Sequence, residues 1–206
     1  IVWDRFEFVS VTADDTRINV DSSFELRYQI RYDFDDVTFD NTKGSISGFT
    51  WDAVNSWWDK SLTGSSSVTS TNYDETYVSI TDTTYGLTAK QDVSGVDVIT
   101  DKARINYEVL DDSRVNINSN IEFRAKGLLL YDNHDLGSGD TVTANFGALA
   151  WDAVNSWFDG TKSQATASDY TFQVASVSEA TYGITAFEVS VSHPTGVWDR
   201  ILVTIS

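Results

Sequence analysis

The chain repeats itself, and this repeat limits what it can fold into more than any other feature. The heptapeptide WDAVNSW at Trp51–Trp57 recurs unchanged at Trp151–Trp157. The segment TYGLTA at Thr84–Ala89 recurs as TYGITA at Thr181–Ala186. Matches in the same order, at offsets of 100 and 97 residues, predict two homologous domains in the 206-residue chain. The change of offset predicts an insertion of about three residues near Tyr131–Gly139.

The repeat also sets the predicted domain boundaries. The first domain covers residues 1–99, and the second covers residues 100–206. The tetrapeptide VWDR at Val2–Arg5 recurs at Val197–Arg200. The segment 197–206, which ends the second domain, therefore matches the start of a third repeat.

Each repeat has the residue pattern of short strands separated by turns. Phe24, Leu26, Tyr28, Ile30 and Tyr32 alternate strictly with polar residues, which is the pattern of a strand with one buried face. Turn residues recur at the spacing found in sandwich domains, and no segment has a helical period. We therefore predict an all-β fold class with two tandem immunoglobulin-like β-sandwich domains.

Composition argues against several classes of function. The formal net charge is −17, whereas nucleic acid and anionic membrane surfaces require clustered Lys and Arg. No apolar run is long enough to span a membrane, and without Cys there are no disulfides or thiol nucleophiles. Only His134 and His193 are present, which leaves little for a His-based active site. From the charge, the apolar runs and these residue counts together, we expect no catalytic residues, no nucleic-acid partner and no membrane insertion. Because Met is also absent, we expect a processed or trimmed product.

These motifs together resemble a known family. Three motifs follow one another in the first repeat: VWDR at Val2–Arg5, WDAVNSWW at Trp51–Trp58 and YGLTA at Tyr85–Ala89. An alternating strand and a Tyr-Asp turn come after the first of them. This order resembles the tandem Ig-like repeats of archaeal secreted and surface-layer-associated proteins, and it covers nearly the whole chain. The resemblance implies an extracellular or cell-surface repeat with a structural role and no catalytic residues. The second repeat departs from the pattern at Thr100, where Trp is absent, and at Phe158.

The Trp-rich segment offers the first candidate binding residues. Trp57, Trp58 and Trp157 could stack on the face of a sugar ring, or they could be core and cross-strand aromatics that fix a hairpin. Neighbouring residues of a strand point to opposite faces, so we expect either Trp57 or Trp58 to lie outside the core. We expect the stretch Asp52–Asn55 to form the turn, with Asn adopting a positive φ.

Acidic residues make calcium the one cofactor to consider. Asp33, Asp35 and Asp36 lie in one predicted loop, and Asp132 and Asp135 lie in the corresponding loop of the second repeat. Calcium takes roughly six to eight oxygen ligands, which clustered carboxylates and turn carbonyls can supply. The spacing does not match an EF-hand loop, and the alternative is a set of solvated turn acids. The sequence therefore gives candidate calcium ligands but no firm metal site.

The C-terminal strand supports the sharpest prediction. Ile201, Val203 and Ile205 share one face of the segment 197–206. This strand could complete the second domain, enter or extend the sheet of a neighbouring subunit, or belong to a longer array from which the chain was cut. In the second alternative the following residues meet at a subunit junction: Val2, Trp3, Phe6, Phe8, Val197, Trp198, Ile201, Val203 and Ile205.

The sequence thus predicts an extracellular structural protein. Head-to-tail strand addition does not close on itself and gives a filament or a surface layer, so further copies of the chain are the expected partners. The alternative is a cell-surface carbohydrate-binding or adhesin module whose partner is a glycan. Paired carboxylates could also serve a glycosidase, but duplicated sites are unusual for an enzyme, so this is kept only as a third alternative.

Overall fold

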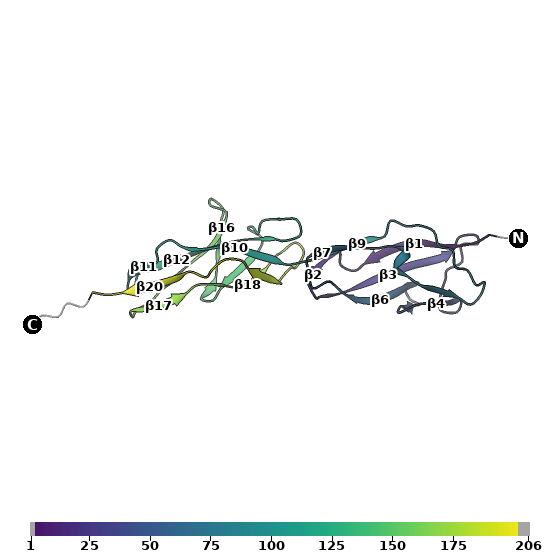
Figure 1. Ribbon diagram of the computed structural model, residues 1–206, viewed down its shortest axis with the longest axis horizontal. Coiled ribbons are helices and arrows are strands. Elements are labelled where there is room, and N and C mark those ends of the chain that lie inside the picture. Colours follow the sequence, from purple (N-terminus) through teal and green to yellow (C-terminus); the bar gives the residue numbers. More distant parts are fainter. Residues whose placement is uncertain (1–2, 202–206) are drawn as a thin grey trace, which may run out of the picture. The chain divides into compact units, whose positions relative to one another are not determined.

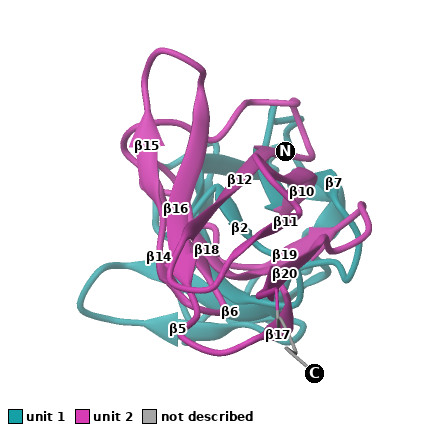
Figure 2. Ribbon diagram, turned by 90° about the vertical axis from the view of Figure 1, so that its left-hand side faces the viewer, with its two compact units in different colours: residues 1–100 teal, residues 101–206 magenta. Residues whose placement is uncertain are grey.

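The chain folds into two compact units built from strands. The computed structural model describes residues 3–201, and its units comprise residues 1–100 (unit 1) and residues 101–206 (unit 2; Figure 2). The one helix among the described residues is a 3₁₀ turn at Glu75–Tyr77, and none there has the length and apolar character that a membrane crossing needs. The predicted all-β, immunoglobulin-like sandwich class is confirmed (Figure 1).

Unit 1 places its strands in three sheets. The strands are β1 (Phe6–Ala13), β2 (Arg17–Asn19), β3 (Ser23–Tyr32), β4 (Gly44–Ile46), β5 (Thr50–Asp52), β6 (Trp57–Thr63), β7 (Thr69–Tyr73), β8 (Ile80–Asp82) and β9 (Val96–Asp101). The main sheet has the order β1-β3-β6-β5, and its strands pair antiparallel. The second sheet has the order β2-β9-β7, and β4 pairs with β8.

Unit 2 repeats this arrangement with additional short strands. They are β10 (Ala103–Leu110), β11 (Arg114–Asn116), β12 (Asn120–Leu129), β13 (Thr141–Ala144), β14 (Gly147–Ala148), β15 (Ala150–Asp152), β16 (Trp157–Ser163), β17 (Ser168–Thr171), β18 (Val174–Ser178), β19 (Phe187–Val189) and β20 (Thr195–Asp199). The main sheet has the order β15-β16-β12-β10-β19. The sheets β11-β20-β17 and β14-β13-β18 complete the unit.

The longest strand of each unit shows why these sequences form sandwiches. β3 and β12 each alternate between buried and less buried residues, because successive side chains of a strand point to opposite faces. The antiparallel partner of each of them carries a bulge at the same place, between Phe8 and Ser10 in β1 and between Ile105 and Tyr107 in β10. The two units therefore share their pairing register as well as their sequence motifs.

Each unit has its own hydrophobic core between its sheets. In unit 1 the core combines Phe24 of β3 with Val98 of β9, which belongs to the other sheet. In unit 2, Phe123 of β12 stacks on Phe172 at a centroid distance of 5.7 Å. Trp198 of β20 is buried in the same core. Side chains from both sheets thus meet in the middle, as a sandwich requires.

The extra residues of the second repeat do not lie near Tyr131–Gly139, where the sequence predicted them. The offset of 97 still holds at Phe39 and Leu136, whose backbone N–H groups make equivalent hydrogen bonds in their units. Further on, the backbone N–H of Leu149 closes a hairpin formed by β13 and β14, whereas unit 1 has a tight turn at Ile46–Phe49. The insertion therefore lengthens this hairpin.

A buried carboxylate holds the TYG motif of each unit. Asp82 accepts hydrogen bonds from the backbone N–H of Leu87 at 3.0 Å and from the hydroxyl of Tyr32 at 2.9 Å. Glu179 takes the equivalent place in unit 2 and accepts from the backbone N–H of Tyr182 at 2.7 Å. Burial by itself raises the pKa of Asp82, but these hydrogen bonds outweigh it and lower the pKa overall.

Candidate functional site

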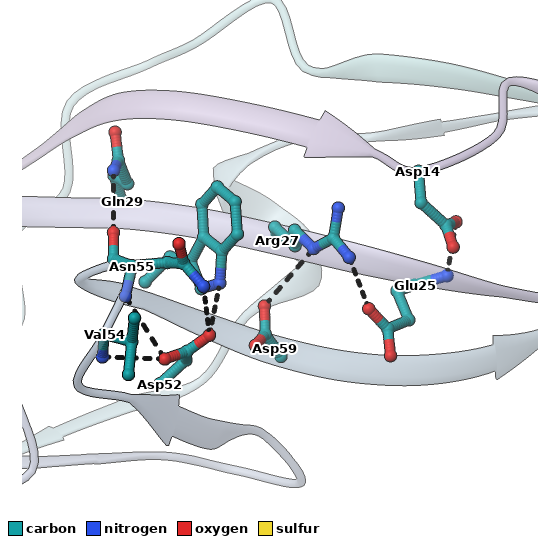
Figure 3. A network of polar contacts seen from close by, with 9 residues as sticks. Asp14, Glu25, Arg27, Gln29, Asp52, Val54, Asn55 and Asp59 are labelled. Carbon is teal, nitrogen blue, oxygen red and sulfur yellow. Dashed lines mark hydrogen bonds and ion pairs between the residues drawn. The ribbon is translucent and has the colours of Figure 1, made fainter.

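One carboxylate clamps the WDAVNSW hairpin of unit 1. Asp52, at the end of β5, accepts hydrogen bonds from the backbone N–H of Val54 at 2.8 Å and from the side-chain amide of Asn55 at 2.7 Å (Figure 3). The indole N–H of Trp57, at the start of β6, donates to the same carboxylate at 3.2 Å. The Asn55 amide is the main group that holds the pKa of Asp52 below its ordinary value. The clamp is therefore ionised at neutral pH.

The hairpin of unit 2 carries the same clamp. Asp152 accepts from the backbone N–H of Val154 at 2.8 Å and from the side-chain amide of Asn155 at 2.6 Å. The Asn155 amide again contributes most to the lowered pKa of Asp152. One detail differs, because the indole N–H of Trp157 has no hydrogen-bond partner within residues 3–201. The identical letters of the two motifs otherwise specify the same turn.

In each turn, the residue with a positive φ is not the predicted one. The sequence suggested Asn for this role, but Ser56 (φ 59°) and Ser156 (φ 54°) adopt it. Asn55 uses its side chain to bond Asp52 instead. Asn and Ser both favour turn positions through local side-chain hydrogen bonds. The residue types alone therefore did not show which of the two would adopt the positive φ.

The predicted Trp residues divide between core and surface, as the alternation of a strand requires. Trp58 is buried and donates its indole N–H to the backbone carbonyl of Phe39 at 2.8 Å. Phe158 takes the same buried place in unit 2. The structure thus corrects the expectation that Trp58 contacts a ligand, because its ring is closed off by the core. Trp57 and Trp157 are half-buried and remain the partly accessible members of the group.

Cations lie over both half-buried tryptophans. The guanidinium of Arg27 is 4.9 Å from the ring centroid of Trp57, and that of Arg124 is 4.7 Å from the ring centroid of Trp157. Lys126 lies 5.5 Å from the ring centroid of Trp157. A cation over an aromatic ring is favourable, and it occupies ring surface on which a sugar would stack. The arrangement therefore fits a structural role for these rings better than an open sugar platform.

The cation beneath the first hairpin is itself held by acids. Arg27 forms an ion pair with Glu25 on the same strand, and its Nε lies 3.6 Å from Oδ1 of Asp59 (Figure 3). Burial raises the pKa of Asp59, and Arg27 opposes this shift. Burial likewise raises the pKa of Asp159 in unit 2. Basic and acidic side chains of the same sheet thus lie next to each other beside each hairpin.

The most exposed apolar residues of the hairpins lie at their tips, and sequence reasoning missed them. Val54 is 91% exposed and Val154 is 90% exposed. The β15–β16 hairpin projects from the rest of unit 2 (Figure 2). Single exposed valines are common, but here the same valine stands on the same clamped turn in both units. The signal in the sequence was a valine set among turn-forming letters in both copies of the motif.

The structure does not assemble the predicted calcium ligands into a site. Asp33 forms an ion pair with Arg5 at 2.8 Å, and Asp36 forms one with Arg31 at 3.2 Å. The remaining candidates accept hydrogen bonds within their own turns or join an isolated β-bridge: Asp35, Asp132 and Asp135. In the part of the chain that the structure describes, no group of three or more His, Cys, Asp or Glu side chains could hold a metal ion. These acids serve turns and ion pairs instead.

Two of the four predicted interface residues near the N-terminus are core residues. Phe6 and Phe8 of β1 are buried in the core of unit 1, and the backbone N–H of Phe6 donates to Ala89 at 2.9 Å. Neither side chain can meet a second subunit while β1 keeps this place, which corrects the expectation. Trp3 is 91% exposed, and Val2 lies outside the described residues.

The C-terminal candidates divide in the same way. β20 contains Val197 and Trp198, and it pairs with β11 on one side and β17 on the other. Trp198 is buried and donates its indole N–H to the carbonyl of Ser119 at 2.8 Å. Residues 195–199 thus complete unit 2, and Trp198 is no free interface residue. Ile201 is 91% exposed, whereas Val203 and Ile205 lie outside the described residues.

In each unit an open cleft lies near a predicted terminal segment. The cleft of unit 1 has a volume of about 390 Å³ and is lined by Asp4, Phe34, Asp35, Tyr85 and Leu87. The cleft of unit 2 has a volume of about 460 Å³, and its lining includes Arg114, Asp199, Arg200 and Ile201. The sequence had pointed to the terminal segments, but it did not show that Phe34 and Arg114 lie beside them.

Comparisons with known proteins give structural neighbours but no family. No protein-family model matches the chain, and no curated protein matches it in sequence. The Yersinia pseudotuberculosis adhesin InvE is similar in structure, with 13% identity, a TM-score of 0.31, and coverage of 93% of this chain and 58% of that one. The Escherichia coli adhesin FdeC shows 10% identity, a TM-score of 0.32, and coverage of 95% and 62%.

The D0-D1 domain of intimin is a third structural neighbour. It has 14% identity and a TM-score of 0.32, and the match covers 94% of this chain and 99% of that one. The chain thus spans 58% and 62% of the lengths of the two adhesin structures, and nearly all of the intimin fragment.

Proposed function

We propose that the chain is part of an adhesin-type protein of the cell surface or extracellular space. In this proposal the Ig-like units form a structural scaffold, and each unit presents its WDAVNSW hairpin as a contact element. The resemblance of the motifs to archaeal surface repeats supports an extracellular setting. The scaffold requires no catalytic residues, no cofactor and no metal.

The observation that carries this proposal is the pair of apolar hairpin tips. Val54 and Val154 are about nine-tenths exposed at tips held by Asp52 and Asp152. Covering an exposed valine contributes about 1.5 kcal/mol or more. Because the turns are already ordered by their clamps, little of this contribution is lost to ordering the loop on binding. The chain thus carries the same contact element twice, once in each unit.

Replacing both tip valines tests the proposal. The chain with Val54→Ser and Val154→Ser should bind about tenfold or more weakly to whole cells of its source, or to immobilised glycans from their surface, because it loses two apolar contacts at once. Surface plasmon resonance or bead pull-down gives the affinity. Val9→Ser is the matched control, since Val9 is an exposed valine of β1 and belongs to neither hairpin. Equal binding by the double variant and the control would contradict the proposal.

A filament built by strand addition is a second proposal, and one observation favours it. Ile201 is almost fully exposed, and the sequence after it continues the alternation that a strand with one buried face requires. In a filament this segment of one copy would enter the main sheet of unit 1 in the next copy. There it would have to displace β1, because Phe6 already fills that place.

Deletion of residues 201–206 tests strand addition. The shortened chain should remain folded, because β20 ends at Asp199, but it should form no large assemblies. Sedimentation velocity and negative-stain electron microscopy would compare it with the full chain under the same salt conditions. Filaments that persist after the deletion would exclude this mode of assembly.

A further inference from the structure

The two units differ at one edge of their main sheets. In unit 2 the outer side of β10 is covered by β19, which pairs with it in parallel from Ala103↔Phe187 to Ile105↔Val189. The cover continues past β19, because the backbone N–H and the hydroxyl of Ser190 both donate to the carbonyl of Ile105, at 2.9 Å and 3.2 Å. Unit 2 therefore closes this part of the edge with its own chain.

In unit 1 the corresponding segment leaves the edge earlier. The backbone N–H of Phe6 donates to the carbonyl of Ala89 at 2.9 Å, and that of Gln91 donates to the carbonyl of Phe6 at 2.8 Å. The bridge Phe6↔Lys90 is the one β-pairing on this side of β1 within residues 3–201. Past Phe6, no described strand lies beside the outer side of β1 in its sheet.

Polar contacts hold this segment of unit 1 at the 3₁₀ turn that begins at Glu75. The ammonium of Lys90 donates to the carbonyls of Glu75 and Val78, at 2.6 Å and 3.0 Å. The backbone N–H of Val93 donates to the Glu75 carboxylate at 2.9 Å. Val93 is the equivalent of Ser190 at an offset of 97 residues. The N–H that closes the edge in unit 2 is therefore used elsewhere in unit 1.

The direction of each backbone group of β1 follows from the alternation of a strand. The N–H and C=O of one residue point to the same side of the strand, and those of the next residue point to the opposite side. Both groups of Phe6 face away from β3, because they bond the segment 89–91. The groups of Phe8, two residues further on, therefore face away from β3 as well. In unit 2 the carbonyl of the equivalent Ile105 receives the bonds from Ser190.

The same reasoning applies to β1 beyond its bulge. Asp14 follows β1 and is bonded to Glu25 of β3 through its backbone N–H at 3.1 Å and its side chain at 2.7 Å (Figure 3). Counted back from Asp14, the N–H and C=O groups of Ala13 and Val11 face away from β3. In the described part of the chain these outward groups form no hydrogen bond. Phe8, Val11 and Ala13 thus form an open sheet edge.

The charge around this edge selects the kind of partner. Asp92 comes directly after the segment that is bonded to Phe6, and Asp14 and Asp15 directly follow β1. All three acids are exposed, and unit 1 contains 17 acidic and 7 basic residues. A second copy of this edge would bring acids against acids in either direction, which is unfavourable. A strand with basic ends meets an acid at each end instead.

We propose that the open edge formed by Phe8, Val11 and Ala13 binds an extended peptide segment with basic residues at both ends. The peptide adds to the main sheet of unit 1 as a further strand, through main-chain hydrogen bonds. Unit 2 lacks this site, because β19 and Ser190 occupy the equivalent edge. The inference goes beyond the contact role of the hairpins. It also differs from filament assembly, because β1 keeps its place in the sheet.

Synthetic peptides test the site directly. The probe is a short capped peptide in which Val and Thr alternate between two terminal lysines, and fluorescence anisotropy measures its affinity for the 206-residue chain. N-methylation of every peptide amide should weaken binding about tenfold or more. Methylation of alternate amides is the matched control, because it leaves one edge of the peptide able to pair. Glutamates in place of the lysines should weaken binding several-fold. Equal binding of the fully methylated peptide, or no saturable binding of the lysine peptide, would overturn the proposal.

A substitution in β1 tests the same site from the side of the protein. Val11→Pro removes one outward N–H, and proline is tolerated on an edge strand where its N–H would face solvent. The variant should bind the lysine peptide about tenfold or more weakly. Val11→Ala is the matched control, because it shortens the side chain but keeps the N–H, and it should bind like the wild type. Equal binding by the two variants would contradict the proposal, and thermal unfolding checks that both are folded.

Amide exchange followed by NMR needs no substitution. In the free chain the amides of Phe8, Val11 and Ala13 should exchange about tenfold or more faster than those of Ser10 and Thr12, which face β3. Saturating lysine peptide should slow the three outward amides and leave β10 of unit 2 unchanged. Exchange that the peptide does not slow would overturn the proposal. Protection that rises with the concentration of the free chain would also overturn it, since a second copy would then be the partner.

These readouts are independent of the hairpin tips. The double variant Val54→Ser and Val154→Ser keeps the edge of β1 intact and should bind the lysine peptide like the wild type. Loss of cell binding in that variant therefore tests the hairpins alone, and loss of peptide binding in Val11→Pro tests the edge alone.

Discussion

At the scale of single residues, carboxylates organise much of this acidic chain. Asp52 and Asp152 each gather the N–H groups of a turn, and Asp82 and Glu179 do the same from buried positions. Hydrogen bonds to an ionised acceptor are stronger than neutral ones, so each acid fixes the backbone around it. The spacing of acids in the sequence showed that they lie in turns. The spacing could not show from which N–H groups the acids accept hydrogen bonds. It therefore suggested that several acids share a cation.

The lowered pKa of Asp82 predicts how the stability of unit 1 depends on pH. A carboxyl whose folded pKa lies below its ordinary value near 3.8 contributes stability above that value and loses it as the pH falls through the folded pKa. Asp82→Asn should cost about 1 kcal/mol at pH 7 and should flatten the loss of stability below pH ~4. Urea unfolding between pH 7 and pH 2 measures both effects. An identical pH profile for the variant and the wild type would assign the acid sensitivity to other groups.

At the scale of elements, the sequence predicted periodicity well and the details of packing poorly. The alternation in Phe24–Tyr32 predicted β3, which is buried on one face as expected. The pair Trp57 and Trp58 predicted that one ring leaves the core, but not which one, because the alternation is symmetric. In unit 1 the buried ring, Trp58, donates its indole N–H to the carbonyl of Phe39. Phe39 lies in a segment with no regular period, so this contact could not be predicted from the sequence.

The hairpin clamp gives a prediction at this scale. Asp52→Ala removes the acceptor that holds Val54, Asn55 and Trp57, so the backbone amides of the turn should exchange with solvent about tenfold or more faster. The β3–β6 ladder should keep its protection, because its hydrogen bonds do not involve Asp52. Hydrogen exchange followed by mass spectrometry separates the two regions. The intact hairpin at Asp152 is an internal control, and faster exchange there would indicate a general loss of stability rather than a local one.

At the scale of the whole molecule, the repeat in the sequence determined most of what could be predicted. It divided the chain at residues 99 and 100, and the structure divides it after residue 100. The prediction of interface residues near the two termini was less successful. The burial of a side chain depends on the elements that pack against its strand as well as on the residues of the strand. Trp3 and Trp198 occupy equivalent places in the VWDR repeat, yet Trp198 is buried in unit 2 and Trp3 is 91% exposed. The VWDR motif by itself therefore does not determine whether its Trp is buried.

The central claim is that the two hairpin tips make the contacts of this molecule, and dissociation rates from the target surface test it most directly. Val54→Ser and Val154→Ser would be measured singly and together on the same immobilised cells or glycans. If both tips bind, each single variant should dissociate faster than the wild type, and the double variant should dissociate about tenfold or more faster. Dissociation of all three variants at the rate of the wild type would contradict the claim.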